Sequence, residues 1–212
     1  NLSKKILSWY DNNKRILPWR ISQKSKKKHY YRILSEFMLQ QTQVKTVIPY
    51  FKNFVHKVPS LKALSKSNEK KILKLWEGLG YYSRAKNLHK TSRILINKHK
   101  GIIPENFTEL KALPGIGDYT ANVLLALIYN QPRIAIDGNV RRVLSRLFKA
   151  NVEDPINLFE TKRNGDLVEA LMEFGALICK PKNPRCNECE IKKMCAYYAS
   201  ESKIQFKRKI KI

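Results

Sequence analysis

Apolar residues recur at spacings of three and four along most of the chain, which is the pattern of amphipathic helices. Ser60 and Ser67 are expected to cap two of these helices, and Gly78 and Gly80 to end the second of them. No segment alternates apolar and polar residues as a strand does, so the pattern predicts an all-α fold made of short helices. The segments with the helical pattern are residues 2–16, 33–49, 60–77, 83–98, 110–129 and 140–147.

The stretch ILSEFMLQQTQV, residues 33–44, places one carboxylate, Glu36, on an apolar surface when it is written as one helix. A carboxylate beside apolar neighbours is poorly solvated, which favours its protonated form. A carboxyl group that stays protonated near neutral pH can act as a general acid. Because most helical glutamates lie on the surface, an ordinary exposed Glu36 stays open at this point.

Residues 110–129, LKALPGIGDYTANVLLALIY, contain a Pro-Gly-x-Gly break between two helical segments. Glycines in such a turn let backbone N–H groups approach a ligand closely, and the second helix presents its positive N-terminus. The pattern favours a phosphate site at Gly115 and Gly117. A plain corner between two helices fits the same glycines.

Asp137 stands directly before another helical pattern, in RIAIDGNVRRVLSRLF. An aspartate at a helix N-cap accepts backbone N–H groups at the positive end of the helix dipole, which favours the ionised carboxylate. Ordinary capping explains this residue equally well. One protonated and one ionised carboxyl is nevertheless the arrangement that glycosidic bond cleavage uses, and Glu36 and Asp137 would supply it.

The chain of 212 residues carries 42 Lys and Arg against 17 Asp and Glu, a formal net charge of +25. Such an excess favours a polyanionic partner, and nucleic acid is the first candidate. A general preference for Lys would explain the abundance of bases but not the scarcity of acids. No apolar run approaches the roughly 18 residues that cross a bilayer, and no secretory signal is recognisable. We therefore expect a soluble, intracellular protein, cytoplasmic and nucleoid-associated, without a membrane partner.

All four cysteines form one C-x6-C-x2-C-x5-C cluster near the end of the sequence. The disulfides of secreted proteins usually join distant segments, so a tight group favours a metal site. Four thiolates without a nearby His suit either tetrahedral zinc or a four-iron cluster, and the single CxxC pair favours the iron cluster. The cysteines are Cys179, Cys186, Cys189 and Cys195.

Several motifs together resemble one family. LPGIGDYTA followed by IAIDGNVRRVLSR is similar to the helix–hairpin–helix and catalytic Asp of the endonuclease III superfamily of DNA glycosylases. LPWR, SEFMLQQTQV, VIPYF and WEGLGYYSRAKNLH extend the resemblance, over nearly the whole chain, to the adenine DNA glycosylases of the MutY type. The resemblance implies a helix–hairpin–helix glycosylase fold with a [4Fe–4S] cluster held by the four cysteines. It also implies that a monomer binds mismatched double-stranded DNA.

The resemblance further implies a division into domains. A six-helix, barrel-like domain is expected over residues 25–133, and an iron–sulfur domain formed by both chain ends over 1–24 and 134–198. Residues 199–212 would be a basic tail. The family's C-terminal domain, which reads 8-oxoguanine opposite adenine, is absent from this sequence.

Roles can be carried over where positions match the family's motifs. Glu36 would protonate adenine at N7, and Asp137 would stabilise the oxocarbenium-like sugar once the base has been flipped out of the duplex. Tyr119 and Asn139 would hold the reacting groups, and Gly115 and Gly117 would grip a phosphate. The positions that match the adenine pocket are Trp19, Arg20, Gln41 and Glu169.

Three alternatives fit the sequence less well than adenine removal does. Endonuclease III uses a lysine after the hairpin as a Schiff-base nucleophile; Tyr119 stands there, so we expect base excision without strand cleavage. Thymine mismatch glycosylases share the Tyr but lack the Glu-x4-Gln of Glu36 and Gln41. A non-catalytic DNA-binding module would need neither Glu36 nor Asp137. The expected activity is hydrolysis of the N-glycosidic bond of adenine mispaired with 8-oxoguanine or guanine.

Overall fold

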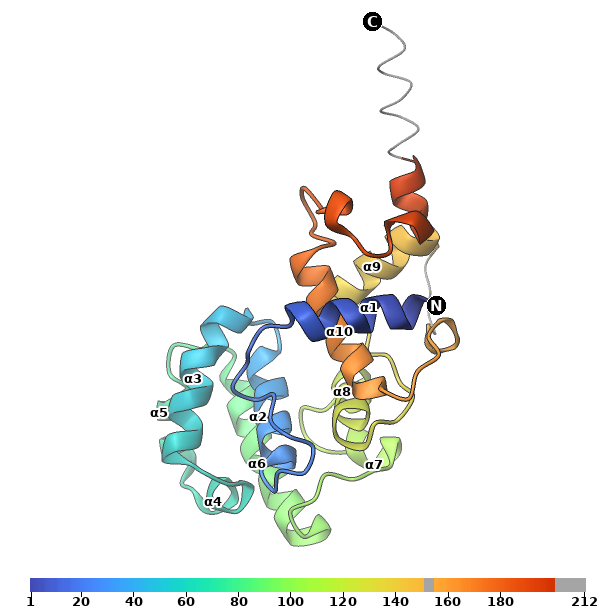
Figure 1. The fold of residues 1–212 in the computed structure, drawn as a ribbon. Helices are drawn as coiled ribbons and strands as arrows, with labels where there is room; N and C mark the ends of the chain where they lie inside the picture. The colour runs from blue at the N-terminus through green and yellow to red at the C-terminus, as the bar shows by residue number, and fades with distance from the viewer. Residues whose placement is uncertain (151–154, 201–212) are drawn as a thin grey trace, which may run out of the picture. The chain divides into compact units, whose positions relative to one another are not determined.

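The structure is a computed structural model that describes residues 1–150 and 155–200. Every regular element in this part is a helix, so the all-α prediction is confirmed (Figure 1). The α-helices are α1 (Leu2–Asn13), α2 (Lys28–Leu39), α3 (Val44–Lys57), α4 (Leu61–Lys66), α5 (Glu69–Trp76), α6 (Tyr82–His99), α7 (Phe107–Lys111), α8 (Asp118–Tyr129), α9 (Gly138–Phe148) and α10 (Asn164–Leu177). Three short 3₁₀ turns follow in the second half: Ile156–Leu158, Cys186–Glu188 and Lys192–Met194.

The described residues form two compact units, each with its own hydrophobic core. The central unit is the continuous segment Ile16–Tyr129, and the terminal unit combines Asn1–Arg15 with the described residues from Asn130 on. The functional domains expected at residues 25–133 and at both chain ends stay a prediction. The expected basic tail lies outside the described residues except for positions 199 and 200.

The core of the central unit surrounds α2, which contacts α3, α6 and α8 (Figure 1). Seven consecutive residues of α2, from Arg32 to Met38, are buried, so this helix has neighbours on all sides. Phe51 of α3 and Trp76 of α5 are fully buried in the same core. A helix buried all round is a rigid support for any side chain that it carries.

The extent of the helix that carries Glu36 was predicted wrongly. α2 ends at Leu39, Gln41 takes a left-handed backbone with φ 56°, and α3 begins only at Val44. Pro49, expected near the end of the first helix, lies inside α3. Neither Gly nor Pro marks the break. The helix break instead coincides with a tertiary contact, in which Arg84 donates hydrogen bonds to carbonyls in the last turn of α2.

The predicted caps of the next two helices are half right. Ser60 caps α4, and its hydroxyl accepts the N–H of Ala63 at 3.1 Å. At α5 the cap is Asn68, whose side chain accepts the N–H of Lys70 at 2.8 Å, and Ser67 instead ends α4. Asn and Ser are about equally good N-caps, so the sequence alone could not choose between neighbours.

In the terminal unit, α10 packs against both α1 and α9 (Figure 1). The Arg15 guanidinium donates in bidentate fashion to the buried Glu173 carboxylate, with Nε–Oε2 and Nη2–Oε1 distances of 2.8 Å. Arg163, just before α10, binds Asp11 of α1 at 2.7 Å. These charged hydrogen bonds fasten the start of the chain to a helix far along the sequence. In the described part, no helix has both the length and the apolar character to cross a membrane.

Candidate functional site

Glu36 lies in the third turn of α2 and is only 9% exposed. Its helix neighbours Ile33 and Phe37 are fully buried. The alternative of an ordinary surface glutamate is therefore wrong. Only a small part of the Glu36 side chain is accessible, so a substrate could reach this carboxyl group only through that part.

The hairpin between α7 and α8 packs directly against the helix that carries Glu36. Gly115 has φ 78°, and a Cβ there would lie 2.7 Å from the Phe37 ring and 2.9 Å from the Asn87 Cβ. The Gln40 side chain, at the end of α2, donates to the Gly115 carbonyl at 3.2 Å. Gly115 is thus required both by its backbone conformation and by the close approach of the hairpin to α2.

The other predicted positions of the hairpin face open space. A Cβ at Gly117 would meet nothing within 4 Å, so this glycine leaves the backbone accessible at the start of α8. Tyr119, the second residue of α8, is 37% exposed. The expected phosphate contact at this turn stays a prediction, and the local geometry leaves room for it.

The residues matched to the adenine pocket differ in their surroundings. Gln41 is exposed at the turn after α2, and Arg20 is half-buried. Trp19 is 3% exposed and packs edge-on against Phe51, with ring centroids 5.3 Å apart. In the terminal unit, Glu169 is buried on α10, and its carboxylate accepts the Tyr10 hydroxyl at 2.8 Å. Their roles toward adenine stay predictions.

Asp137 caps α9, as the sequence pattern predicts. Its Oδ1 accepts the N–H of Val140 at 2.7 Å, and its Oδ2 accepts the side-chain amide of Asn139 at 3.1 Å. Each carboxylate oxygen therefore has a donor from the same helix. The two hydrogen bonds fix the orientation of the carboxylate.

Sequence reasoning missed Arg142, which continues this network. Its Nη2 donates to Asn139 Oδ1 at 2.7 Å and to the Gly175 carbonyl at 2.8 Å, and its Nε donates to the Cys179 carbonyl at 2.7 Å. A Cβ at Gly175 would lie 2.7 Å from the Cβ of Asn139, so this glycine lets α10 approach α9 closely. The sequence did contain a sign of the contact between Arg142 and Asn139, because side chains three residues apart lie next to each other on a helix.

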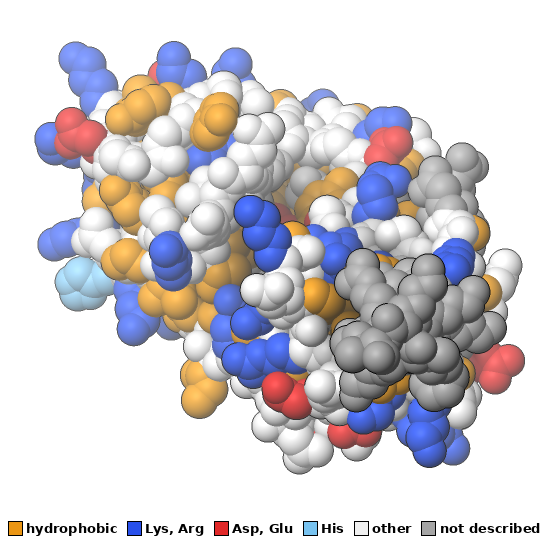
Figure 2. All heavy atoms as spheres, turned by 90° about the horizontal axis from the view of Figure 1, so that it is seen from above, with side chains coloured by type: hydrophobic (Ala, Val, Ile, Leu, Met, Phe, Trp, Pro, Cys, Tyr) orange, Lys and Arg blue, Asp and Glu red, His pale blue; other side chains and the backbone are white. Residues whose placement is uncertain are grey.

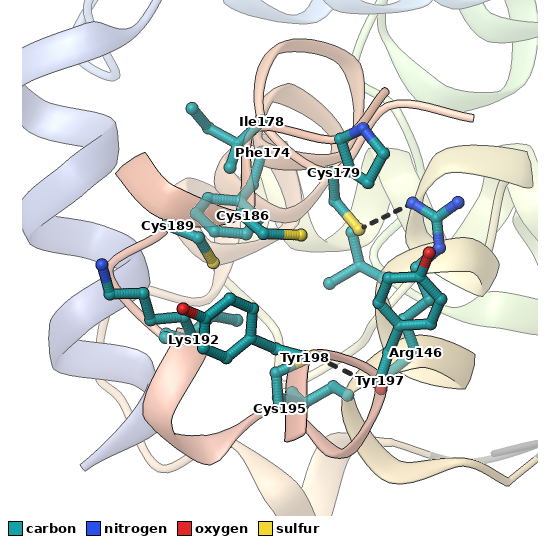
Figure 3. Close-up of a pocket in the computed structure, with 14 residues that line it drawn as sticks. Arg146, Phe174, Ile178, Cys179, Cys186, Cys189, Lys192, Cys195, Tyr197 and Tyr198 are labelled. Atoms are coloured by element: carbon teal, nitrogen blue, oxygen red, sulfur yellow. Dashed lines mark hydrogen bonds between the residues drawn. The ribbon is translucent and has the colours of Figure 1, made fainter. Parts of the chain in front are cut away.

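The four cysteines line one pocket of the terminal unit, together with aromatic and aliphatic side chains from α9, α10 and the loop after it. Figure 3 shows the sulfur atoms of Cys179, Cys186 and Cys189 turned toward the same space. None of these four described cysteines forms a disulfide. Burial raises the pKa of the Cys189 thiol to about 11. A bound cation would oppose this effect, because coordination favours the thiolate.

Arg146 of α9 was also not foreseen as part of this pocket. Its Nη1 lies 3.5 Å from the Cys179 sulfur and donates to the Lys180 carbonyl at 2.7 Å (Figure 3). Cys195 in turn lies within 3.4 Å of the Arg146 carbonyl. Among the described residues, no three His, Cys, Asp or Glu side chains converge on the position of a single metal ion.

Basic side chains outnumber acidic ones on the drawn face as well as in the composition (Figure 2). On the face drawn in Figure 2, Lys and Arg are spread widely and Asp and Glu are few. This distribution is typical of a protein that binds a polyanion.

The predicted site residues fall into two sets, one in each unit. Glu36, Gln41, Tyr119 and the hairpin belong to the central unit, where the hairpin and the Glu36 helix are in contact. Asp137, Asn139, Glu169 and the cysteines belong to the terminal unit, where Asp137 and Asn139 are hydrogen-bonded.

Comparisons with known proteins agree on the class of protein. The family model described as "HhH-GPD superfamily base excision DNA repair protein" matches residues 34–163. The adenine DNA glycosylase of Buchnera aphidicola subsp. Baizongia pistaciae is 40% identical over 211 residues, which is 94% of this chain and 59% of the relative. The human adenine DNA glycosylase is 37% identical, over 90% of this chain and 38% of its own length. The chain thus spans less than two thirds of these relatives.

Among solved structures, a thermostable thymine-DNA glycosylase superimposes with a TM-score of 0.83 and 26% identity, covering 94% of this chain and 95% of that one. A trapped endonuclease III–DNA covalent intermediate superimposes with a TM-score of 0.74 at 21% identity, over 94% of both chains. The second likeness concerns the fold alone, and it confirms the expected helix–hairpin–helix glycosylase fold.

Proposed function

The chain belongs to the HhH-GPD superfamily of base excision DNA repair proteins, and from this premise we propose that it is a monofunctional adenine DNA glycosylase. Its substrate would be adenine opposite 8-oxoguanine or guanine in double-stranded DNA, which it would bind as a monomer. The observation that carries the proposal is the burial of Glu36 in α2, beside the hairpin. Relatives that are about 40% identical and are named adenine DNA glycosylases support the choice of base.

The proposed reaction begins with extrusion of the adenine, because stacking in the duplex hides it from any acid. Glu36 donates its proton to adenine N7. The bond between the base and the sugar C1′ then breaks, and its electron pair leaves with the adenine. Asp137 stabilises the positive charge that develops on the sugar, and water attacks C1′ to leave an abasic site.

The residues around the two carboxyl groups would act by positioning. Asn139 and the N–H of Val140 hold the Asp137 carboxylate in one orientation. Tyr119, at the exposed start of α8, would contact the flipped nucleotide. Because no lysine stands at this position, no Schiff base forms there and the strand stays intact.

The four cysteines fit a [4Fe–4S] cluster better than a zinc ion. All four line one pocket of the terminal unit, and only one pair of them has the CxxC spacing that zinc sites commonly repeat. A four-iron cluster accepts one thiolate on each of its separate irons. When bound, the cluster would cross-link residues 179–195 into one basic loop, and Arg146 would donate to one of its thiolate ligands.

A second candidate activity is removal of mismatched thymine. It is favoured by the superposition on the thermostable thymine-DNA glycosylase, with a TM-score of 0.83. The lower identity to that protein, 26% against 40% for the adenine-specific relative, makes it the weaker candidate.

The test is single-turnover cleavage of four duplexes: A opposite 8-oxoguanine, A opposite guanine, T opposite guanine, and an oxidised pyrimidine. Each reaction is divided and analysed with and without hot alkali, which breaks abasic sites. We expect adenine loss that becomes visible as strand breaks only after alkali. Loss of thymine alone would support the second candidate, and breaks without alkali would contradict the monofunctional assignment.

A further inference from the structure

An ion pair spans the hairpin between α7 and α8. Lys111, the last residue of α7, places its Nζ 2.6 Å from Oδ1 of Asp118, the first residue of α8. Both side chains are exposed, Lys111 to 52% and Asp118 to 67%. An exposed pair of this kind adds little to the stability of a protein, so the fold does not depend on it.

The hairpin itself is fixed by its neighbours in the central unit. The Pro114 carbonyl accepts the Thr91 hydroxyl at 2.8 Å, and the Gly115 carbonyl accepts the side-chain amide of Gln40 at 3.2 Å. The two charged side chains therefore meet across a turn whose backbone is held from outside. Either of them can turn toward another partner while the backbone of the hairpin stays in place.

Asp118 lies where the phosphate of a DNA strand is expected to bind. The N-terminus of a helix attracts an anion, and the first turn of α8 already contains the Asp118 carboxylate. This residue directly follows Gly117, which leaves the backbone accessible. A carboxylate in this position repels a phosphate, and it also holds the Lys111 ammonium, which a phosphate would otherwise attract.

We propose that Asp118 competes with the DNA phosphate at the hairpin, both for the N-terminus of α8 and for Lys111, and so limits the affinity of the protein for DNA. This inference rests on the proposed function and on the phosphate contact expected at Gly115 and Gly117. While the ion pair is intact, Lys111 neutralises Asp118 instead of a phosphate. A weaker contact at this turn shortens the lifetime of the complex, so the abasic product dissociates sooner.

The test measures equilibrium binding to a mismatched duplex whose target adenosine carries a 2′-fluorine. The fluorine disfavours positive charge on the sugar, so the duplex stays uncleaved during the measurement. Wild type is compared with Asp118→Asn, with Lys111→Gln and with the double variant. Affinities are measured from about 50 to 200 mM salt, because each phosphate that a lysine neutralises changes the slope of log K against log salt by about 1.

Asp118→Asn should bind about tenfold more tightly at the lowest salt, with a slope steeper by about 1, because Lys111 is then available to a phosphate. Lys111→Gln should bind about threefold more weakly with the wild-type slope, because it leaves the Asp118 charge unopposed. The double variant should have the wild-type slope, since it has lost both the competing carboxylate and the lysine that the carboxylate withholds.

Asp166→Asn is the matched control. Asp166 also lies in the first turn of a helix, α10, and its Oδ2 lies 2.7 Å from Nε of Arg163. The substitution removes the same charge and breaks an ion pair of the same kind, but away from the hairpin. It should leave the salt slope unchanged.

Each outcome bears on the inference. Equal effects of Asp118→Asn and Asp166→Asn, or no effect of either, would overturn it, because the position of the carboxylate would then not matter. A slope that stays steeper in the double variant would also overturn it, because Lys111 would then not be the group that gains a phosphate. The unmodified adenine duplex tests the proposed function separately: binding that shifts as expected without adenine loss would contradict that function and still support the role of Asp118.

Discussion

The side-chain amide of Asn139 donates to the Asp137 carboxylate, with Nδ2 3.1 Å from Oδ2. The other oxygen accepts the backbone N–H of Val140 at 2.7 Å. Asp137 therefore cannot turn without losing one of these bonds. A carboxylate held in this way can stabilise a developing positive charge without first having to reorient during the reaction.

Asn139→Ala should slow adenine excision by roughly tenfold to a hundredfold, since a hydrogen bond to a charged group is worth about 1.5–3 kcal/mol. The affinity for DNA should stay the same, because Asn139 acts on the orientation of Asp137. Single-turnover rates and equilibrium binding measure the two effects. Asn12→Ala, at an exposed position of α1, is the control. Equal losses of rate and affinity would mean that Asn139 contacts DNA directly.

Glu36→Gln should lower the excision rate by at least about 10²-fold, because a positioned general acid contributes that much or more. Gln keeps the shape of Glu36 but carries no transferable proton, so binding of the mismatched duplex should persist. Glu69→Gln, at the exposed start of α5, serves as a matched control. A Glu36→Gln protein that turned over at the wild-type rate would remove Glu36 from the mechanism.

Cys186→Ser and Cys189→Ser should each reduce the iron content and the brown colour of the purified protein, whose absorption is expected near 400 nm (approximate). Both thiols line the cysteine pocket, and Ser is a poor ligand for iron. Iron and zinc analysis with absorption spectra gives the readout. Met194→Leu, at an exposed position beside Cys195, should keep full iron content. Stoichiometric zinc in a colourless wild-type protein would be incompatible with the cluster.

His29 should make the folded protein less stable as the pH falls below about 6.5, the ordinary His pKa. Burial, reinforced by the charge of Lys28, lowers the pKa of His29, and its Nδ1 accepts the N–H of Ile103 at 3.1 Å. The unfolded chain then binds the proton more readily than the folded chain, so stability is complete above the unfolded pKa and is lost below it.

Melting temperatures measured from about pH 8 to pH 5, the range in which His titrates, test this expectation. His29→Asn keeps an acceptor but cannot titrate, so its melting temperature should fall less with pH than that of wild type. His56→Asn, at an exposed site, should follow the wild type. Some dependence should remain in His29→Asn, because burial lowers the pKa of His89 as well. Identical pH curves for wild type and His29→Asn would rule out the effect.

Features that depend on local sequence were predictable. The hairpin glycines, the Asp137 cap and most helical segments follow from spacing, capping and backbone preference, which act within a few residues. The break after α2 was not predictable in this way, because it depends on Arg84. Arg142 and Arg146 were missed for the same reason: they bind carbonyls that are distant in sequence. The burial of Glu36 needed the packing of α2 against its neighbours.

The terminal unit joins α1 to α10, and the bonded residues Arg15 and Glu173 are 158 positions apart. A ribosome that adds 5–20 residues per second needs about 8–30 s to make that stretch. The central unit is one continuous segment, so it can fold during that time. Until α10 emerges, Ile6, Trp9 and Tyr10 of α1 have no core to enter. During synthesis α1 therefore waits with an uncovered apolar face, and aggregation or capture by a chaperone would begin at this face.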